Sequence, residues 1–285
     1  MNYHEQYDAY LARAKRALEE ACRRYLPAES QVCQAARYSL MGGGKRVRAV
    51  LVLSVCDMLG GDDAAAEQFA AAVEMLHCYS LIHDDLRRGR PSCHKAFGEA
   101  TALLAGDVLL TEAFEAATHA CAAPEVCLQA AQALSRGAGS RGMVYGQELD
   151  LKYEVLDPTE SQLMLIHHNK TGALINAAVQ MGAAAAGATE AQREALEQYA
   201  YGLGLVFQIV DDVLDATATT EQLGKPAGSD KDNGKTTFVT LYGPDGAMTL
   251  AQQVNQDTCE AVHTAFGEKA AFLEQLAAAM LERRS

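Results

Sequence analysis

The sequence of 285 residues predicts an all-α protein, a single-domain large helical bundle over residues 1–285 with a buried site among its helices. Ala, Leu, Glu and Gln dominate the composition, there are only 6 prolines, and few segments alternate with the period of a strand. Apolar residues recur at helical spacing in four long windows, which are 64–86, 125–149, 159–186 and 190–215. Turn-forming residues occur at 60–62, 89–91, 157–158 and 224–234.

The charge balance narrows the classes of partner. Lys and Arg total 24 and Asp and Glu total 37, so the net charge of −13 argues against nucleic-acid binding. A small anionic substrate is still possible, because a divalent cation can reverse the field within one site. The chain has no apolar run long enough for a membrane span and no signal-peptide core, so we expect a soluble cytoplasmic protein. Its eight cysteines form no CxxC pair, which predicts buried free thiols.

A glycine turn opens the first candidate binding element, since residues 42–44 are all glycine and Lys45 and Arg48 follow. Glycine lets the backbone approach an anion closely, and a helix N-terminus presents free N–H groups to it. Lys45 and Arg48 are three residues apart and share a helix face. The P-loop spacing is absent, and the glycine run alone also fits a plain turn between helices.

Two adjacent aspartates, Asp84 and Asp85, end an apolar helical segment that also contains His77. Arg87 and Arg88 follow after a single residue. Arginine binds phosphate oxygens bidentately, so this element is a second candidate for anion binding. A charge-paired helix end is the alternative.

The strongest local signal is the carboxylate pattern at 211–215. Asp211 and Asp215 lie one helical turn apart on one face, where like charges repel unless a cation lies between them. Their neighbours are apolar, and carboxylates on a partly buried helix suit a hard ion such as Mg²⁺. A solvated acidic face is an equal alternative for this short pattern alone. Lys225 and Lys235 follow in a basic loop. Carboxylates, a divalent ion and lysines together would bind a polyphosphate, whereas a polar surface loop is the simpler alternative.

Eight segments in a fixed order carry a family resemblance: GGGKRVR, HDDLRRGRPSCHK, FGEATALLAGD, GQELD, KTGALI, QIVDDVLD, LGKPAGSD and GKTTFVTLYG. In order and spacing they resemble the trans-isoprenyl diphosphate synthases over nearly the whole chain, with most similarity to the bacterial farnesyl diphosphate synthases. The resemblance implies the isoprenoid synthase fold, a helical bundle whose two Asp-rich motifs face each other across a central cavity, in a homodimer. It also implies that isopentenyl diphosphate condenses with dimethylallyl or geranyl diphosphate while Mg²⁺ holds the leaving pyrophosphate.

The resemblance assigns roles residue by residue. Isopentenyl diphosphate would be held by Lys45, Arg48, His77 and Arg88. The allylic diphosphate or its leaving group would contact Arg87, Lys170, Thr171, Gln208, Lys225 and Lys235. Lys170, Gln208, Lys225 and Asp211 are the catalytic candidates, and the metal ligands would be Asp84, Asp85, Asp211 and Asp215. Arg283 and Arg284 either close over isopentenyl diphosphate or form a frayed basic tail.

The first Asp-rich motif departs from the family pattern, in which a further aspartate precedes the arginine pair. Here Leu86 is followed at once by Arg87, so about eight residues of a metal-binding loop are absent relative to that pattern. Either the protein lacks this loop and is a poor catalyst or a regulatory partner, or the natural chain carries residues that the present sequence omits. We favour the second interpretation, because every other motif is intact.

Tyr79 and Ser80 are the candidates that set product length. Tyr79 lies five residues before Asp84, which is about 7.5 Å along a helix, so its ring would lie deeper in the cavity than the metal site. In the family, a large aromatic residue at this place goes with a C15 product, so we expect (2E,6E)-farnesyl diphosphate. The alternative is a tyrosine of the core.

Three alternative functions would be distinguished by different features. A terpene cyclase would carry an Asn/Ser/Glu metal triad in place of the pattern at 211–215. A geranylgeranyl or geranyl diphosphate synthase would differ in product length. A non-catalytic regulatory subunit would show no turnover on its own.

Overall fold

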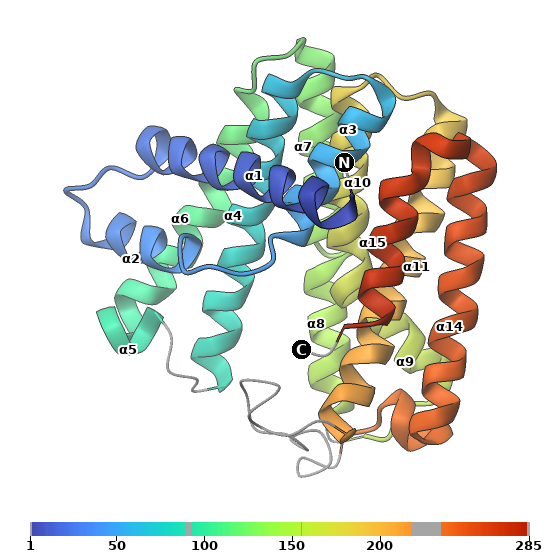
Figure 1. Ribbon diagram of the computed structural model, residues 1–285. Helices are drawn as coiled ribbons and strands as arrows, with labels where there is room; N and C mark the ends of the chain where they lie inside the picture. Colours follow the sequence, from blue (N-terminus) through green and yellow to red (C-terminus); the bar gives the residue numbers. More distant parts are fainter. Residues whose placement is uncertain (1, 89–92, 155, 218–234, 284–285) are drawn as a thin grey trace. The chain divides into compact units, whose positions relative to one another are not determined.

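The computed structural model describes residues 2–88, 93–154, 156–217 and 235–283 (Figure 1). Every regular element within these ranges is a helix, which confirms the predicted all-α class. None of these helices is both long and apolar enough to cross a membrane. The chain forms two compact units, Met1–Ser135 with Ala177–Thr189 and Arg136–Asn176 with Glu190–Ser285. That all 285 residues form one domain around a central cavity stays a prediction.

The first unit is built mainly from the N-terminal helices. They are α1 (Tyr3–Tyr25), α2 (Gln31–Leu40), α3 (Val47–Leu59), α4 (Asp63–Arg88), α5 (Cys93–Phe97), α6 (Glu99–Thr118) and most of α7 (Pro124–Ala138). Helix α1 begins at a capping box in which Asn2 Oδ1 accepts a hydrogen bond from the Glu5 N–H at 2.9 Å. Arg13 then ties α1 to α3 and α4 through ion pairs of 2.9 Å with Asp57 and 2.7 Å with Asp63.

The core of the first unit centres on α3, whose residues 49–56 are all buried. A helix that is apolar on every side requires neighbours on every side. Helices α1 and α4 pack against it, and α4 also packs along α6. Helix α10 (Ala173–Ala185) approaches α3 so closely that a Cβ on Gly182 would lie 2.4 Å from the Val52 carbonyl oxygen. Only glycine allows this backbone contact.

The second unit contains the remaining elements. They are α8 (Met143–Tyr153), α9 (Glu160–His167), a π-helix η1 (His168–Gly172), α11 (Glu190–Thr217), α14 (Phe238–Phe266), η2 (Gly267–Ala270) and α15 (Ala271–Leu281). Helices α11, α14 and α15 lie side by side (Figure 1). The fully buried Tyr199 of α11 donates a hydrogen bond of 2.8 Å to the Leu273 carbonyl oxygen of α15, so the polar end of a core side chain also joins two helices.

Two of the predicted helical windows are interrupted. The window 125–149 is not one helix, because α7 ends at Ala138 and α8 begins at Met143. A Cβ on the intervening Gly142 would lie 2.4 Å from the carbonyl oxygens of Arg136 and Gly137, so the chain turns where only glycine fits. The window 159–186 is helical, but it changes to π-helix between His168 and Gly172. Such π segments often occur at functional sites.

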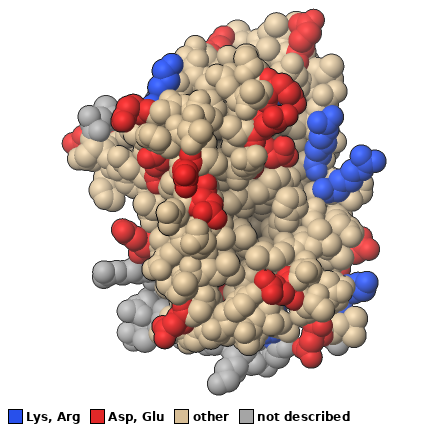
Figure 2. Space-filling model, turned by 90° about the vertical axis from the view of Figure 1, so that its right-hand side faces the viewer, with Lys and Arg blue, Asp and Glu red and all other residues tan. Residues whose placement is uncertain are grey.

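The cysteines and the surface agree with the composition. All eight cysteines are free thiols, six of them buried, whereas Cys121 is exposed and Cys259 is partly exposed. The prediction of buried free thiols is therefore confirmed for most of them. Acidic side chains are scattered over the face shown in Figure 2, as the net charge of −13 leads one to expect.

Candidate active site

The candidate residues fall in both units. In the first unit they lie at the start of α3 and along the second half of α4. In the second unit they lie on η1, on α11 and in the segment that precedes α14. Lys225 and Arg284 lie outside the described residues.

Arg46 and Glu74 fix the start of α3. Arg46 has a left-handed backbone with φ of 51°, and its Nη1 lies 3.3 Å from Glu74 Oε2. The Glu74 side chain is only 3% exposed, and its Oε1 accepts a hydrogen bond of 3.1 Å from the Ala49 N–H. A buried carboxylate on α4 therefore holds the first turn of α3 and the glycine turn before it. This anchorage positions Arg48, although the sequence motif did not single out Arg46 or Glu74.

Arg48 and His77 lie close enough for the Arg48 charge to act on the His77 imidazole. Burial lowers the pKa of His77 well below its usual range, and the nearby Arg48 charge lowers that pKa further, so the imidazole is neutral at pH 7. Arg48 Nε and His77 Nδ1 are both buried and have no hydrogen-bond partner among the described residues. Such orphaned polar atoms are costly unless a ligand satisfies them. The pair fits the predicted diphosphate contact.

Lys45 lies in the turn before α3, and its side chain is exposed. Its carbonyl oxygen accepts a hydrogen bond of 2.6 Å from the Tyr7 hydroxyl of α1. The backbone at Lys45 is thus held in place by α1.

Tyr79 is 8% exposed, and its ring meets His83 edge-on with 5.6 Å between the ring centroids. Ser80 donates its hydroxyl to the His77 carbonyl oxygen at 2.7 Å, so this hydroxyl is engaged by its own helix. Tyr79 is therefore a packed side chain whose ring can exclude other apolar groups. Its role in product length stays a prediction, as does that of Ser80.

Asp84 and Asp85 are half-buried on the last turns of α4. The backbone continues as helix through Leu86 to Arg88, so the aspartate pair and the arginine pair occupy successive turns of one helix. The side chains of Arg87 and Arg88 lie outside the described residues. Their predicted diphosphate contacts stay predictions.

Asp150 joins two of the predicted lysines in the second unit. Lys170 Nζ lies 2.6 Å from Asp150 Oδ2, and Lys235 Nζ lies 3.1 Å from Asp150 Oδ1. The Asp150 side chain is 3% exposed. Burial alone would raise the pKa of its carboxyl, but the two ammonium groups outweigh burial and hold the pKa well below its usual range. One ionised carboxylate therefore brings two cations together.

The π-helix η1 places Lys170 on this carboxylate. Helix α8 passes so close to η1 that a Cβ on Gly146 would lie 2.1 Å from the Lys170 backbone nitrogen. Gly146 and Asp150 are one turn apart on α8, so the approach of the backbones also brings the carboxylate to the lysine. The next residue, Thr171, donates its hydroxyl to Gln208 Oε1 at 2.7 Å and so links η1 to α11.

The three aspartates of α11 have different surroundings. Asp211 is 36% exposed, and its Oδ1 lies 3.2 Å from Arg283 Nη2. Asp212 is 7% exposed, and its Oδ2 accepts a hydrogen bond of 2.9 Å from the Phe238 N–H at the start of α14. Asp215 is 3% exposed. Asp212 thus anchors the start of α14. Its role therefore differs from that of Asp211 and Asp215, the two predicted metal ligands.

The carboxylates of Asp211 and Asp215 on α11 fit a magnesium ion that substrate phosphates and water also bind. No group of three or more His, Cys, Asp or Glu side chains that could hold a metal ion occurs in the described part of the chain. Asp211 and Asp215 supply only oxygen donors, and Asp211 already attracts a cationic side chain. Magnesium is commonly bound by one or two carboxylates and completed by substrate phosphates and water. The α11 carboxylates fit that arrangement and not an all-protein cage.

Sequence reasoning missed two residues of this region. Asp150 ends the GQELD segment, so the motif signalled it without indicating its partners. His167 is 6% exposed, and neither of its ring nitrogens has a hydrogen-bond partner among the described residues. Burial, followed by the Lys235 charge, lowers the pKa of His167 to about 3. Its ring lies 5.4 Å from that of Phe238, and no sequence pattern marked it.

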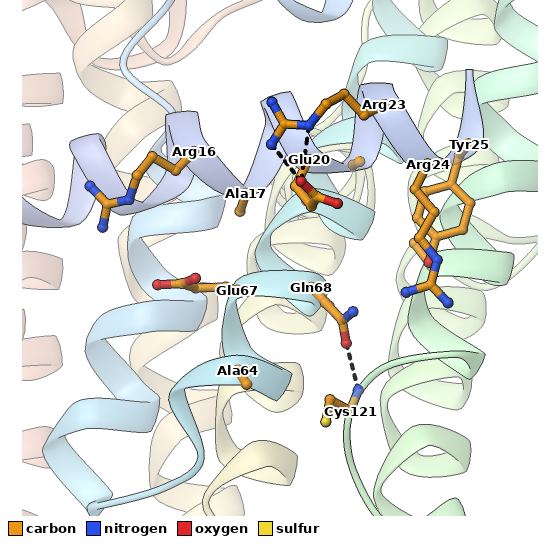
Figure 3. A pocket seen from close by; sticks show the side chains of 13 residues that line it. Arg16, Ala17, Glu20, Arg23, Arg24, Tyr25, Ala64, Glu67, Gln68 and Cys121 are labelled. Carbon is orange, nitrogen blue, oxygen red and sulfur yellow. Dashed lines mark hydrogen bonds and ion pairs between the residues drawn. The ribbon is translucent and has the colours of Figure 1, made fainter. Parts of the chain in front are cut away.

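The first unit also contains a cavity of about 400 Å³ (Figure 3). Helix α1 lines it with three arginines, Arg16, Arg23 and Arg24, and α4 contributes Gln68. None of the candidate residues named above lines this cavity. The candidate site is therefore defined by its polar side chains and not by this hollow.

Comparison with known proteins adds to this geometry. The model of the family described as polyprenyl synthetase matches residues 29–278. The chain belongs to the polyprenyl synthetase family. Within this family, the chain is 42% identical to the farnesyl diphosphate synthase of Micrococcus luteus, with 86% of this chain and 87% of that protein covered.

Two further proteins are similar to this chain. Geranylgeranyl pyrophosphate synthase 11 of Arabidopsis thaliana, a chloroplast protein, is 41% identical over 95% of this chain and 80% of its own. The Helicobacter pylori geranyltransferase, solved in complex with magnesium and isoprenyl diphosphate, has a TM-score of 0.83 at 30% identity, covering 97% of this chain and 96% of that one. These likenesses confirm the predicted family and its all-α fold.

Proposed function

We propose that this protein is a short-chain prenyltransferase that condenses isopentenyl diphosphate with dimethylallyl or geranyl diphosphate, giving (2E,6E)-farnesyl diphosphate and pyrophosphate. The observation that carries the proposal is the pairing of Lys170 and Lys235 on Asp150. The Thr171–Gln208 hydrogen bond links this cluster to the helix of Asp211 and Asp215. Two lysines and two carboxylates that would bind magnesium therefore lie within one unit. Such a set of groups suits a substrate that loses a diphosphate, because the lysines and the metal would neutralise its charge.

In the second unit, Lys170 and Lys235 would neutralise the diphosphate of the allylic substrate. Thr171 holds the oxygen of the Gln208 amide, so the amide N–H₂ can donate to an oxygen of the leaving group. Lys225 and Arg87 would add to these contacts. Asp211 and Asp215 would hold magnesium, as would Asp84 and Asp85 of the first unit. When bound, magnesium would stabilise the negative charge that develops on the leaving pyrophosphate.

In the first unit, Arg48 and His77 would bind the diphosphate of isopentenyl diphosphate, with Lys45 and Arg88 as further contacts. Arg48 supplies a charge and His77, held neutral by burial, supplies a hydrogen bond. The C1–O bond of the allylic substrate breaks and the electron pair leaves with pyrophosphate. The double bond of isopentenyl diphosphate then attacks C1, and the proton lost from the new cation passes to pyrophosphate. Apolar side chains such as Tyr79 would keep water from the carbocation.

The decisive experiment is an assay of the purified protein alone with magnesium, isopentenyl diphosphate and geranyl diphosphate. We expect pyrophosphate release together with a C15 product by chromatography. An Asp211→Asn variant and a sample with EDTA are the negative controls, and an Asp257→Asn variant on the exposed part of α14 controls for the loss of one charge. Folded protein without turnover would overturn the proposal and favour a non-catalytic regulatory subunit.

A longer product is the second candidate, and the 41% identity to a geranylgeranyl pyrophosphate synthase favours it. The same assay separates the two, since a C20 product as the main species would replace the farnesyl assignment. We further propose a cytoplasmic homodimer. Sedimentation of the purified protein at twice the chain mass of 30.5 kDa would support the dimer.

The missing part of the first Asp-rich motif bears on the alternative of a regulatory subunit. The sequence of 285 residues runs directly from Leu86 to Arg87, and helix α4 continues through both residues to Arg88. The expectation that residues are omitted at this point is therefore wrong, and the protein lacks the distal part of the motif. The turnover assay decides whether the shorter motif still supports catalysis.

A further inference from the structure

Arg283 lies just beyond the end of α15 and contacts α11 in three ways. Its Nη2 donates to the Phe207 carbonyl oxygen at 2.8 Å and to Asp211 Oδ1 at 3.2 Å. Its guanidinium carbon lies 4.0 Å from the centroid of the Phe207 ring. A carbonyl, a carboxylate and an aromatic face thus receive one cation, and all three belong to the same turn of α11.

The docking of Arg283 on α11 buries a charged side chain, which costs free energy of hydration. The Arg283 side chain is 11% exposed, and its Nε is buried without a hydrogen-bond partner among the described residues. Burial lowers the pKa of Arg283, while the Asp211 carboxylate opposes that shift. An arginine beyond the end of a helix would ordinarily extend into water. The attraction of Asp211 and the Phe207 ring therefore offsets the loss of hydration.

Arg283 and a divalent metal ion would compete for the Asp211 carboxylate. Asp211 is a magnesium ligand under the proposed function, on which this inference rests. A divalent ion on the same carboxylate would repel the guanidinium strongly at such short range. We propose that Arg283 is a counter-ion that occupies Asp211 while the metal is absent and is displaced when the metal binds. Metal binding would then release the C-terminal end of α15 from α11.

The docking of Arg283 on Asp211 and the binding of metal are coupled. Whatever free energy Arg283 contributes by docking on Asp211 must be given up when the metal binds, and docking weakens metal binding by the same factor. The Asp211 side chain is 36% exposed, so its ion pair with Arg283 contributes only modest free energy. Removing this ion pair should therefore tighten metal binding about two- to fivefold. In its docked position, Arg283 also keeps the Asp211 carboxylate in place before the substrate arrives.

The first test measures Mn²⁺ affinity by the electron paramagnetic resonance signal of the free ion, with inorganic pyrophosphate present. Arg283→Met keeps the apolar stem on the Phe207 ring and removes the charge. Lys269→Gln, an exposed position in η2, removes one charge from the same C-terminal region without touching Asp211. We expect tighter Mn²⁺ binding by Arg283→Met alone. Equal affinity in the wild type and both variants would overturn the inference.

The second test follows the C-terminal end directly. The chain has no tryptophan, so Glu282→Trp introduces a single fluorophore at an exposed position next to Arg283. We expect its emission and anisotropy to change when Mg²⁺ and pyrophosphate are added together, and to return with EDTA. Metal binding without this change would overturn the inference and leave the proposed function intact. If the wild type binds no Mn²⁺ even with pyrophosphate, the proposed magnesium site fails and the inference fails with it.

Discussion

Lys170 Nζ lies 2.6 Å from Oδ2 of the buried Asp150, and the other oxygen of that carboxylate holds Lys235 at 3.1 Å. Two ammonium groups from different elements would repel each other without the carboxylate between them. Asp150 thus holds both lysines together, and under the proposed function it would position them for the diphosphate.

The first prediction concerns Asp150→Asn, which preserves the shape of the side chain and removes its charge. Because the lysines would then repel and move apart, we expect kcat/KM for the allylic diphosphate to fall about 10- to 100-fold. Steady-state kinetics of pyrophosphate release would measure this. Glu148→Gln, on the exposed side of α8, is the matched control and should behave as the wild type. Equal kinetics for the two variants would remove Asp150 from this role.

The second prediction concerns acid stability and His167. An unfolded histidine takes up its proton near pH 6.5, whereas burial holds the pKa of folded His167 at about 3. The unfolded state therefore binds the extra proton between these values, and the free energy of unfolding falls as pH falls. For this one group the loss between pH 6.5 and pH 5 should be about 2 kcal/mol.

Urea unfolding of the wild type and of His167→Phe at several pH values would measure that loss. The variant keeps an aromatic ring against Phe238 but cannot take up a proton, so its stability should decline less between pH 6.5 and pH 5. His119→Phe, at an exposed position, should follow the wild type. Parallel pH curves for the wild type and His167→Phe would contradict the prediction.

The third prediction separates the adjacent aspartates of α11. Asp212→Ala leaves the Phe238 N–H at the start of α14 without its acceptor and should lower the free energy of unfolding by about 1–3 kcal/mol. Asp211→Asn should change stability little and reduce turnover about 100-fold, because under the proposed function it removes a magnesium ligand. Urea midpoints and turnover measured on both variants test this division. Similar stability losses in both would show that the two side chains share one structural role.

The fourth prediction concerns Tyr79. Tyr79→Ala opens space where a packed ring now lies, so chromatography should show products longer than C15. The same substitution should cost about 3–5 kcal/mol of stability, which requires assays at low temperature. Tyr79→Phe keeps the ring and should retain the C15 product. An unchanged product profile for Tyr79→Ala would assign Tyr79 to the core alone.

The sequence by itself determined the helical class, the family and most of the polar residues of the candidate site. Helical periodicity is a local property, so α4 and α11 could be predicted from apolar spacing alone. The π-helix at His168–Gly172 and the break before Met143 depend on how closely α8 and its neighbours approach, and no local pattern reports that distance.

Tertiary structure decided what each polar residue does. Asp211 and Asp212 are neighbours in sequence, yet one meets Arg283 and the other receives the start of α14. Lys170 and Lys235 are far apart in the chain and meet only because one buried carboxylate accepts both. A sequence motif records which groups are available. Pairing between distant elements depends on packing, because a buried charge must find a partner wherever the fold brings one.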